Sequence, residues 1–299
     1  MKTDSTQGVL RAILAFSLFA SLPAYVQLLQ PLSGYTVFGQ RILWTSVLLF
    51  GSLLLFARAD LREIGRRLGC WQSWPGYLLG SWLVGIQFWA FVWGPMNGMT
   101  LDLALGYFML PLTMVITGRL LYREQLRPLQ WLAVCSALLG VVSALFLSGG
   151  FSWLALLIAL GYPPYFVLRR YQPLPPLQTF SIENILLLPI AIFLCIHFGA
   201  VEHPFAYGIV DLGLFAGLGL LGAIPMLLWL GASRILTFGV LGLVGNVEPL
   251  VIFAIGLLQG EQVSGAEWLL YGLIFFSLLL LLVDGLKLLL KRRAKLQSA

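Results

Sequence analysis

The sequence predicts an all-α integral membrane protein with ten transmembrane helices. Hydrophobic residues make up 60% of the 299 residues and charged residues only 10%, whereas a soluble globular protein carries roughly a quarter charged residues. The apolar residues form runs close to the roughly 20 residues that a helix needs to cross a bilayer core. These runs lack the period-two alternation typical of a membrane β-barrel. Only helices then satisfy their backbone hydrogen bonds in lipid.

The apolar runs are separated by short polar or glycine- and proline-containing connections. Ten candidates follow one another along the chain, at residues 8–30, 34–57, 75–93, 99–121, 128–147, 151–168, 179–198, 208–231, 235–258 and 267–290. The longest polar connection, 58–74, is too short for an appended soluble domain.

The net charge of +6 is distributed as the positive-inside rule requires for a membrane protein. Lysine and arginine are absent from the connections that follow the odd-numbered runs, residues 31–33, 94–98, 148–150, 199–207 and 259–266. They gather instead near both ends of the chain and on the other connections. Both termini are therefore expected in the cytoplasm and the number of spans is expected to be even. This pattern favours a bacterial-type inner membrane, with a lipid bilayer rather than nucleic acid as the partner of the basic residues.

Two halves of the chain share a pattern. Pro111 in the first half and Pro249 in the second are each followed by Glu-Gln and then by Trp131 or Trp268. Residues 11–25 likewise match residues 151–165, with a proline and a tyrosine in register. We therefore expect one repeat over 1–148 and a second over 149–299, the latter ending in a short basic cytoplasmic tail. Because each repeat has five spans, the second must enter the membrane inverted.

Inverted repeats are a common basis of transporters that alternate access to a site near the bilayer midplane, and matched pairs of interrupted helices point to that site. Here the matched spans are the first and sixth, and the fourth and ninth. Pro111 and Pro249 are thus candidates for gating. The alternative is that these prolines only kink helices to improve packing.

Ionisable residues within the spans are costly and usually face a cavity or a partner. Arg41 is either an anchor for an anionic substrate group or half of a structural ion pair with Asp102. Glu248, two residues after Asn246 and next to Pro249, is expected to face a central cavity and to bind substrate or carry a proton. Glu183 is either neutralised by Arg169 and Arg170 or acts as an inner gate or proton carrier.

Other polar and aromatic residues in the spans could supply hydrogen bonds and ring walls to a substrate. The candidates are Trp44, Gln87, Asn97, Asp102, Tyr107, Tyr165 and Asn246.

Trp93 is an additional candidate that could instead face lipid. The three cysteines, Cys70, Cys135 and Cys195, show no metal-ligand spacing and are expected to be packing thiols. No metal and no cofactor is expected, and the absence of a P-loop pattern argues against ATP hydrolysis.

Three segments carry a resemblance to a known family. QRILWTSVLL in the second span, FVWGPMNGMTLDLALGYFMLPL across the third and fourth, and GEQV after the ninth resemble the RarD family. These are EamA-type proteins of the drug/metabolite transporter superfamily. The resemblance covers nearly the whole chain. It implies ten spans in two inverted five-helix repeats, a central cavity, and transport of small metabolites or drugs, often outward.

Residue by residue, the resemblance is strong in the first half and departs in the second. The family's His-Arg stands here as Gln40-Arg41, its Asn-Trp as Gln87-Phe88, and the glutamate before its Ala-Ser-Leu-Gly-Tyr-Phe as Asp102. The family's glutamate early in the seventh span is retained as Glu183. Its Gln-Tyr-Ile-Gly-Pro is replaced by residues 245–249, GNVEP. This replacement places a carboxylate in the expected cavity wall, so the ligand is expected to differ from that of typical relatives.

These observations favour a secondary transporter of the inner membrane that moves a small polar or amphipathic metabolite or drug by alternating access. Export is the expected direction, and protons are a candidate coupling ion. An uncoupled facilitator or a channel is the alternative, and a membrane-embedded enzyme is a weaker one because no clustered His, Asp and Glu residues are present. The protein is expected as a monomer or a homodimer.

Overall fold

The computed structural model describes most of the chain. The described residues are 2–30, 32–123, 125–147, 152–172, 174–199, 208–233, 235–236, 244–245 and 247–297.

Every regular element in these ranges is helical. The α-helices are α1 (Lys2–Val26), α2 (Gly34–Phe56), α3 (Arg58–Leu68), α4 (Trp74–Met96), α5 (Thr100–Tyr122), α6 (Pro128–Leu147), α7 (Trp153–Arg170), α8 (Pro176–His197), α10 (Ile209–Ser233), α12 (Val247–Leu258) and α13 (Gly265–Gln297), with short 3₁₀ turns at Gln27–Leu29 and Trp71–Ser73.

The long helices follow the predicted apolar runs. Seven of the described helices are long and apolar enough to cross a membrane, namely the helices α1, α2, α4, α5, α8, α10 and α13, and two shorter apolar helices are α6 and α12. α7 overlaps the sixth predicted run. For the ninth run, predicted from residue 235, the described helix begins only at Val247. The chain is therefore an all-helical, multi-pass membrane protein.

Several helices begin where a side chain satisfies free backbone N–H groups. The Ser33 hydroxyl accepts from the Thr36 N–H at the start of α2, at 3.3 Å. Ser152 does the same for Ala155 at the start of α7. Before α13, Ser264 and Glu267 form a reciprocal capping box, with the Ser264 N–H donating to the Glu267 carboxylate at 2.7 Å.

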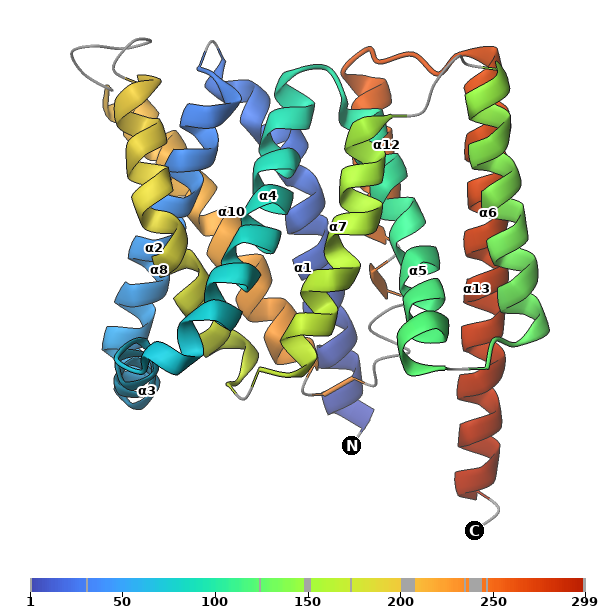
Figure 1. The fold of residues 1–299 in the computed structure, drawn as a ribbon, viewed down its shortest axis with the longest axis horizontal. Helices are drawn as coiled ribbons and strands as arrows, with labels where there is room; N and C mark the ends of the chain where they lie inside the picture. Colours follow the sequence, from blue (N-terminus) through green and yellow to red (C-terminus); the bar gives the residue numbers. More distant parts are fainter. Residues whose placement is uncertain are drawn as a thin grey trace.

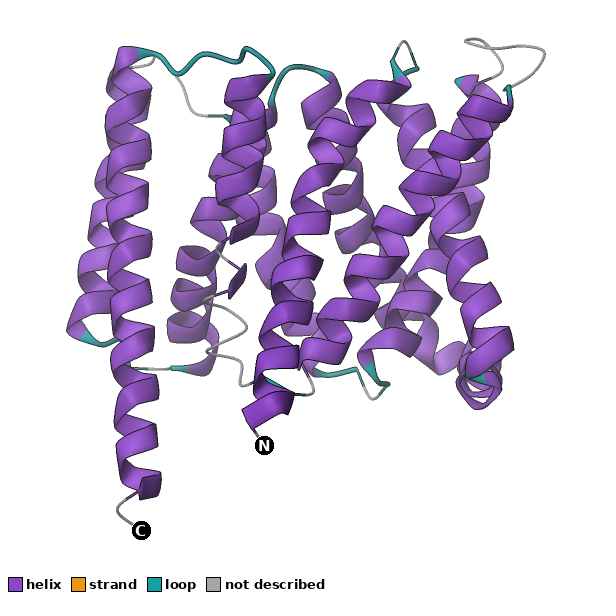
Figure 2. Cartoon of the chain, turned by 180° about the vertical axis from the view of Figure 1, so that it is seen from behind, coloured by secondary structure: helices purple, strands orange, loops and turns teal. Residues whose placement is uncertain are grey.

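The helices stand side by side across the molecule, and both chain ends lie on one side (Figure 1). α3 lies at that same side, as do the C-terminal ends of α5 and α7, which carry Arg119 and the Arg169–Arg170 pair. The basic residues therefore gather at one end of the bundle, as the charge pattern predicts. Seen from behind, α6 and α13 form an antiparallel pair at one edge (Figure 2).

α3 is a short amphipathic helix outside the spans. It buries Ile64 against α8 and the neighbouring helices. Arg66 and Arg67 both donate to the Glu63 carboxylate, at 2.7–3.1 Å. The Arg66 hydrogen bond is the main cause that lowers the pKa of Glu63 to about 2, so Glu63 keeps its charge at physiological pH.

A continuous apolar core joins most of the helices and leaves apolar side chains on the outside. Phe108 and Phe215 are fully buried within this core. Phe146 and Leu258 are largely exposed, as expected for lipid-facing positions. α5 and α7 approach closely at Gly106, where an added Cβ would lie 2.8 Å from the Ile158 Cβ. This approach brings tyrosines of the two helices together.

Candidate functional site

Arg41 is the buried cation at the centre of the candidate site. It lies on α2 with only 4% of its surface exposed. Its guanidinium donates to the Phe88 carbonyl oxygen of α4 at 3.3 Å and lies over the Phe88 ring, 4.8 Å from the centroid. A second ring, Phe91, is 5.9 Å away. Arg41 thus contacts two aromatic rings and donates to one carbonyl oxygen. Because a guanidinium group carries five N–H groups, further donors are left for a ligand.

Two tyrosines face Arg41 from other helices. The Tyr107 hydroxyl on α5 and the Tyr162 hydroxyl on α7 are 2.8 Å apart and hydrogen-bonded. The Tyr107 ring packs edge-on against Phe91 at 5.3 Å. Both tyrosines interact electrostatically with Arg41. One hydroxyl of such a pair donates to the other, so one O–H remains able to donate elsewhere.

Glu248 completes the group from the first turn of α12. It is partly buried and interacts electrostatically with Arg41, Tyr107 and Tyr162. Within the described ranges, no ion pair with N···O within 4.0 Å joins Arg41 to Glu248. Arg41 and Glu248 therefore lie within electrostatic range of one another without an ion pair in the described structure. We call Arg41, Tyr107, Tyr162 and Glu248 the central group.

Four other predicted residues lie on the helices of this group or contact them. Gln87, 2% exposed, donates to the Leu157 carbonyl oxygen at 3.2 Å, and its own carbonyl oxygen has no hydrogen-bond partner in the described structure. Trp44 packs against the α10 backbone at Gly219. Pro249 is buried directly after Glu248, and Pro111 lies one turn beyond Tyr107 in α5.

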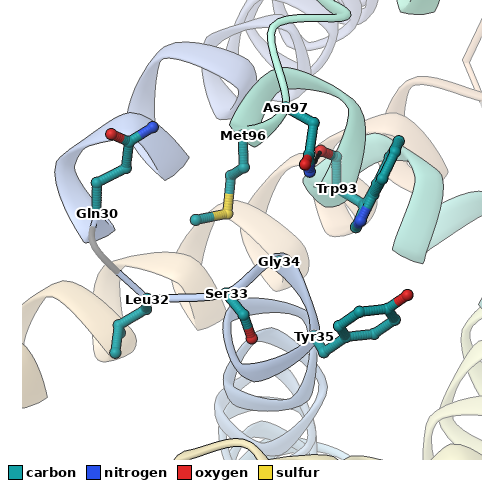
Figure 3. Close-up of a pocket in the computed structure, with 8 residues that line it drawn as sticks. All are labelled: Gln30, Leu32, Ser33, Gly34, Tyr35, Trp93, Met96 and Asn97. Carbon is teal, nitrogen blue, oxygen red and sulfur yellow. Dashed lines mark hydrogen bonds between the residues drawn. The ribbon is translucent and has the colours of Figure 1, made fainter. Parts of the chain in front are cut away.

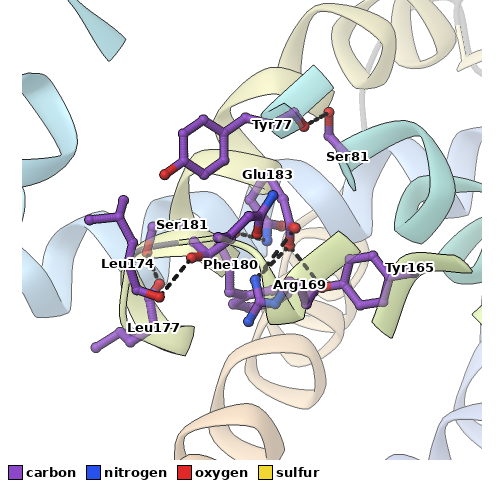
Figure 4. Close-up of polar contacts among 12 residues, drawn as sticks. Tyr77, Ser81, Tyr165, Arg169, Leu174, Leu177, Phe180, Ser181 and Glu183 are labelled. Atoms are coloured by element: carbon purple, nitrogen blue, oxygen red, sulfur yellow. Dashed lines mark hydrogen bonds and ion pairs between the residues drawn. The ribbon is translucent and has the colours of Figure 1, made fainter. Parts of the chain in front are cut away.

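A second polar cluster forms around Glu183 (Figure 4). Glu183 is fully buried on α8. It accepts from the Tyr165 hydroxyl at 2.9 Å and pairs with Arg169 at 3.3 Å, both on α7. Of the two interpretations of Glu183, the neutralised one fits this pairing, with Arg169 rather than Arg170 as the partner. Tyr165, expected to contact substrate, is thus engaged with Glu183.

The C-terminal end of α4 lies at the opposite end of the bundle from α3 (Figure 1), and Trp93 and Asn97 lie at or just beyond that helix end (Figure 3). They line an open pocket of about 470 Å³ with Tyr35, Ser33 and neighbouring residues of the α1–α2 connection. The exposed Asn97 side chain donates back to the Trp93 carbonyl oxygen at 2.7 Å. The structure therefore separates these two residues from the central group.

The proposed Arg41–Asp102 ion pair is absent from the described structure. Asp102 lies in the first turn of α5, near Ser152, the N-cap of α7. Arg41 instead contacts Phe88, Phe91 and the central group.

One predicted site residue is not described by the structure, and three residues at the central group were not predicted from the sequence. Asn246 lies outside the described residues. Tyr162, Phe88 and Phe91 belong to or contact the central group but were not predicted. Tyr162 had a signal, since it immediately precedes the proline pair of the sixth span, whereas the phenylalanines look like ordinary apolar residues. Among the described residues, no cluster of three or more His, Cys, Asp and Glu could hold a metal ion.

Known proteins resemble this chain over nearly its whole length. No protein-family model matches it. A Pseudomonas aeruginosa protein named chloramphenicol-sensitive protein RarD is 37% identical over 96% of this chain and 97% of its own. A Pasteurella multocida protein named an uncharacterized transporter is 36% identical over 97% and 99%. A Haemophilus influenzae protein of the same description is 35% identical over 93% and 94%.

One solved crystal structure shares the fold, with a TM-score of 0.58 over 95% of this chain and 99% of that one, at 19% identity. Near-complete coverage in both directions means that the relatives share the whole membrane domain with this chain. The chain belongs to the RarD family of transporters.

Proposed function

We propose that the protein is a secondary transporter of the inner membrane that moves a small polar or amphipathic solute through the central group by alternating access. The observation that carries this proposal is the placement of Arg41, Tyr107, Tyr162 and Glu248 on four helices, α2, α5, α7 and α12. Charges inside a membrane protein are costly, and they mark substrate or ion pathways. Arg41 and Glu248 are ionisable residues of this kind, inside the helical bundle.

The transport mechanism we propose uses two inverted repeats, residues 1–148 and 149–299, of five spans each. Matching the repeats pairs α1 with α7, α2 with α8, α4 with α10, α5 with α12 and α6 with α13. When each helix is replaced by its partner in the other repeat, one observed helix contact becomes another. The α1–α10 contact becomes α7–α4, α2–α10 becomes α8–α4, and α5–α7 becomes α12–α1. It also maps the α2–α8, α5–α12 and α6–α13 contacts onto themselves.

Hydrogen bonds between α6 and α13 follow the same pairing. Ser136 on α6 donates to the Leu273 carbonyl oxygen at 2.8 Å. Ser277 on α13 donates back to the Ala133 carbonyl oxygen at 2.7 Å. Such reciprocity supports a two-fold relation between the repeats.

The direction and energy source belong to the proposal as well. We propose export, with both termini in the cytoplasm, and proton linkage through Glu248. Glu183 is the less favoured proton carrier because it already pairs with Arg169. An uncoupled facilitator is the alternative, and it needs no titration of either carboxylate.

The test begins with a metabolite library screened for thermal stabilisation of the purified protein. Hits are then followed as flux in proteoliposomes, with and without an imposed pH gradient. A proton-linked transporter gives saturable flux that responds to the gradient and loses that response in Glu248→Gln. Saturable flux that ignores the gradient in both proteins indicates the facilitator, and conversion of a hit to a new product would overturn the transporter proposal.

A further inference from the structure

The central group combines a buried cation, Arg41, with a partly buried carboxylate, Glu248. Arg41 on α2 and Glu248 on α12 interact electrostatically without forming an ion pair within the described part of the chain. Arg41 has lost most of its water and Glu248 part of it, and attraction across a gap offsets only part of that cost. A ligand that carries both opposite charges would neutralise each one by direct contact.

The groups beside the two charges have matching chemistry. The hydroxyl pair of Tyr107 and Tyr162 leaves one O–H free to donate, and it faces Arg41. Together the guanidinium and this hydroxyl offer several hydrogen-bond donors to a carboxylate, for which guanidinium presents a forked pair of N–H groups. Glu248 is an acceptor suited to an ammonium group.

Apolar rings surround this polar centre. Phe88 and Phe91 contact the guanidinium, and the Phe91 ring also packs on Tyr107. Gln87, next to Phe88, carries a buried carbonyl oxygen without a partner in the described structure. A ligand with an apolar body and one further donor would fill this environment.

We propose that the substrate class is a zwitterion of the α-amino acid type, with its carboxylate on Arg41 and the tyrosine hydroxyls and its ammonium on Glu248. This assignment rests on the central group being the transport site. It also accounts for the carboxylate that this chain carries at position 248, because a substrate with an ammonium group needs an anionic partner in the bundle.

The experiment uses matched ligands and matched variants of the full-length protein in detergent. The ligands are the twenty L-α-amino acids, their methyl esters, which lack the carboxylate, and their N-acetyl derivatives, which lack the ammonium. Dissociation constants are measured by thermal stabilisation for the wild type, Arg41→Gln, Glu248→Gln and, as a control, Arg62→Gln on the exposed face of α3.

We expect at least one amino acid to bind the wild type about tenfold or more tightly than either of its derivatives, as for loss of a hydrogen bond to a charged group. Arg41→Gln should abolish the preference for the amino acid over its methyl ester. Glu248→Gln should abolish the preference over the N-acetyl derivative. Arg62→Gln should keep both preferences.

Two results would overturn the assignment. Either no amino acid binds while another solute of the metabolite library is bound and transported, or the amino acids bind with the same preferences in all four proteins. The first result leaves the transporter proposal intact. Failure of every solute to bind or move would remove the transporter proposal as well.

Discussion

The hydroxyl groups of Tyr107 and Tyr162 are hydrogen-bonded at 2.8 Å across the contact between α5 and α7. Tyr107 directly follows Gly106, where α5 packs closely against α7. The hydrogen bond therefore ties helix packing to the central group. Changes at this contact should affect both stability and transport.

Removing either hydroxyl should weaken transport and lower stability modestly. Tyr107→Phe and Tyr162→Phe each delete the shared bond, which is worth roughly 1 kcal/mol. The double variant should be no less stable than the worse single one, because only one bond is lost. Thermal unfolding in detergent and flux in proteoliposomes measure the two effects. Tyr171→Phe, which is 72% exposed, serves as the control, and additive losses in the double variant would contradict the shared bond.

The Glu183–Arg169 pair should be sensitive to which partner is removed. Arg169→Ala leaves the fully buried Glu183 carboxylate without its cation, at a cost of about 3 to 5 kcal/mol. Glu183→Gln removes the charge itself and should cost less. Arg170→Ala, which loses a cation–π contact with Tyr122, is the neighbouring control. Equal losses for the two arginine variants, measured as unfolding midpoints, would show that the pairing is not a stabilising feature.

Glu261 should be a structural cap that holds α5 to the segment after α12. Its carboxylate accepts from the backbone N–H groups of Thr100 and Leu101, both at 2.7 Å. Glu261→Ala should destabilise the protein by about 0.5 to 2 kcal/mol, as for loss of an N-cap. The adjacent, exposed Gln262→Ala should be neutral. The same unfolding midpoint for both variants would contradict a capping role.

Gly106 should not tolerate a side chain. A Cβ there would lie 2.8 Å from the Ile158 Cβ and 3.0 Å from the Ala155 carbonyl oxygen, so α5 and α7 would have to separate. Gly106→Ala should cost about 1 to 3 kcal/mol and should also reduce transport by moving Tyr107 from Tyr162. Gly51→Ala on α2, where nothing lies within 4 Å of the added Cβ, should be neutral or slightly stabilising. Unchanged stability in Gly106→Ala would mean that the helices do not pack as described.

The sequence predicts helix positions well because bilayer crossing depends on local composition. For eight of the ten runs, the described helix begins within three residues of the predicted start; α1 begins earlier, at Lys2, and α12 later, at Val247. The ionisable residues Arg41 and Glu248 were identifiable for the same reason, since a charge within an apolar run is conspicuous without any tertiary information.

Contacts between spans could not be predicted in this way. Arg41 and Asp102 lie at similar expected depths, which suggested an ion pair, but depth does not fix which helix faces which. The rotation of α5 directs Tyr107 toward Tyr162 and places Asp102 beside Ser152. Phe88 and Phe91 contact Arg41 through helix packing, which their apolar side chains do not reveal in the sequence.

The central claim is that Arg41 and Glu248 face a transported solute. Its most direct test is solute counterflow in proteoliposomes with a solute selected by thermal stabilisation of the wild type. The account predicts saturable counterflow in the wild type and in Arg62→Gln, and at least a tenfold loss of kcat/KM in both Arg41→Gln and Glu248→Gln. Wild-type counterflow in both central variants, with each correctly folded by its unfolding midpoint, would contradict it.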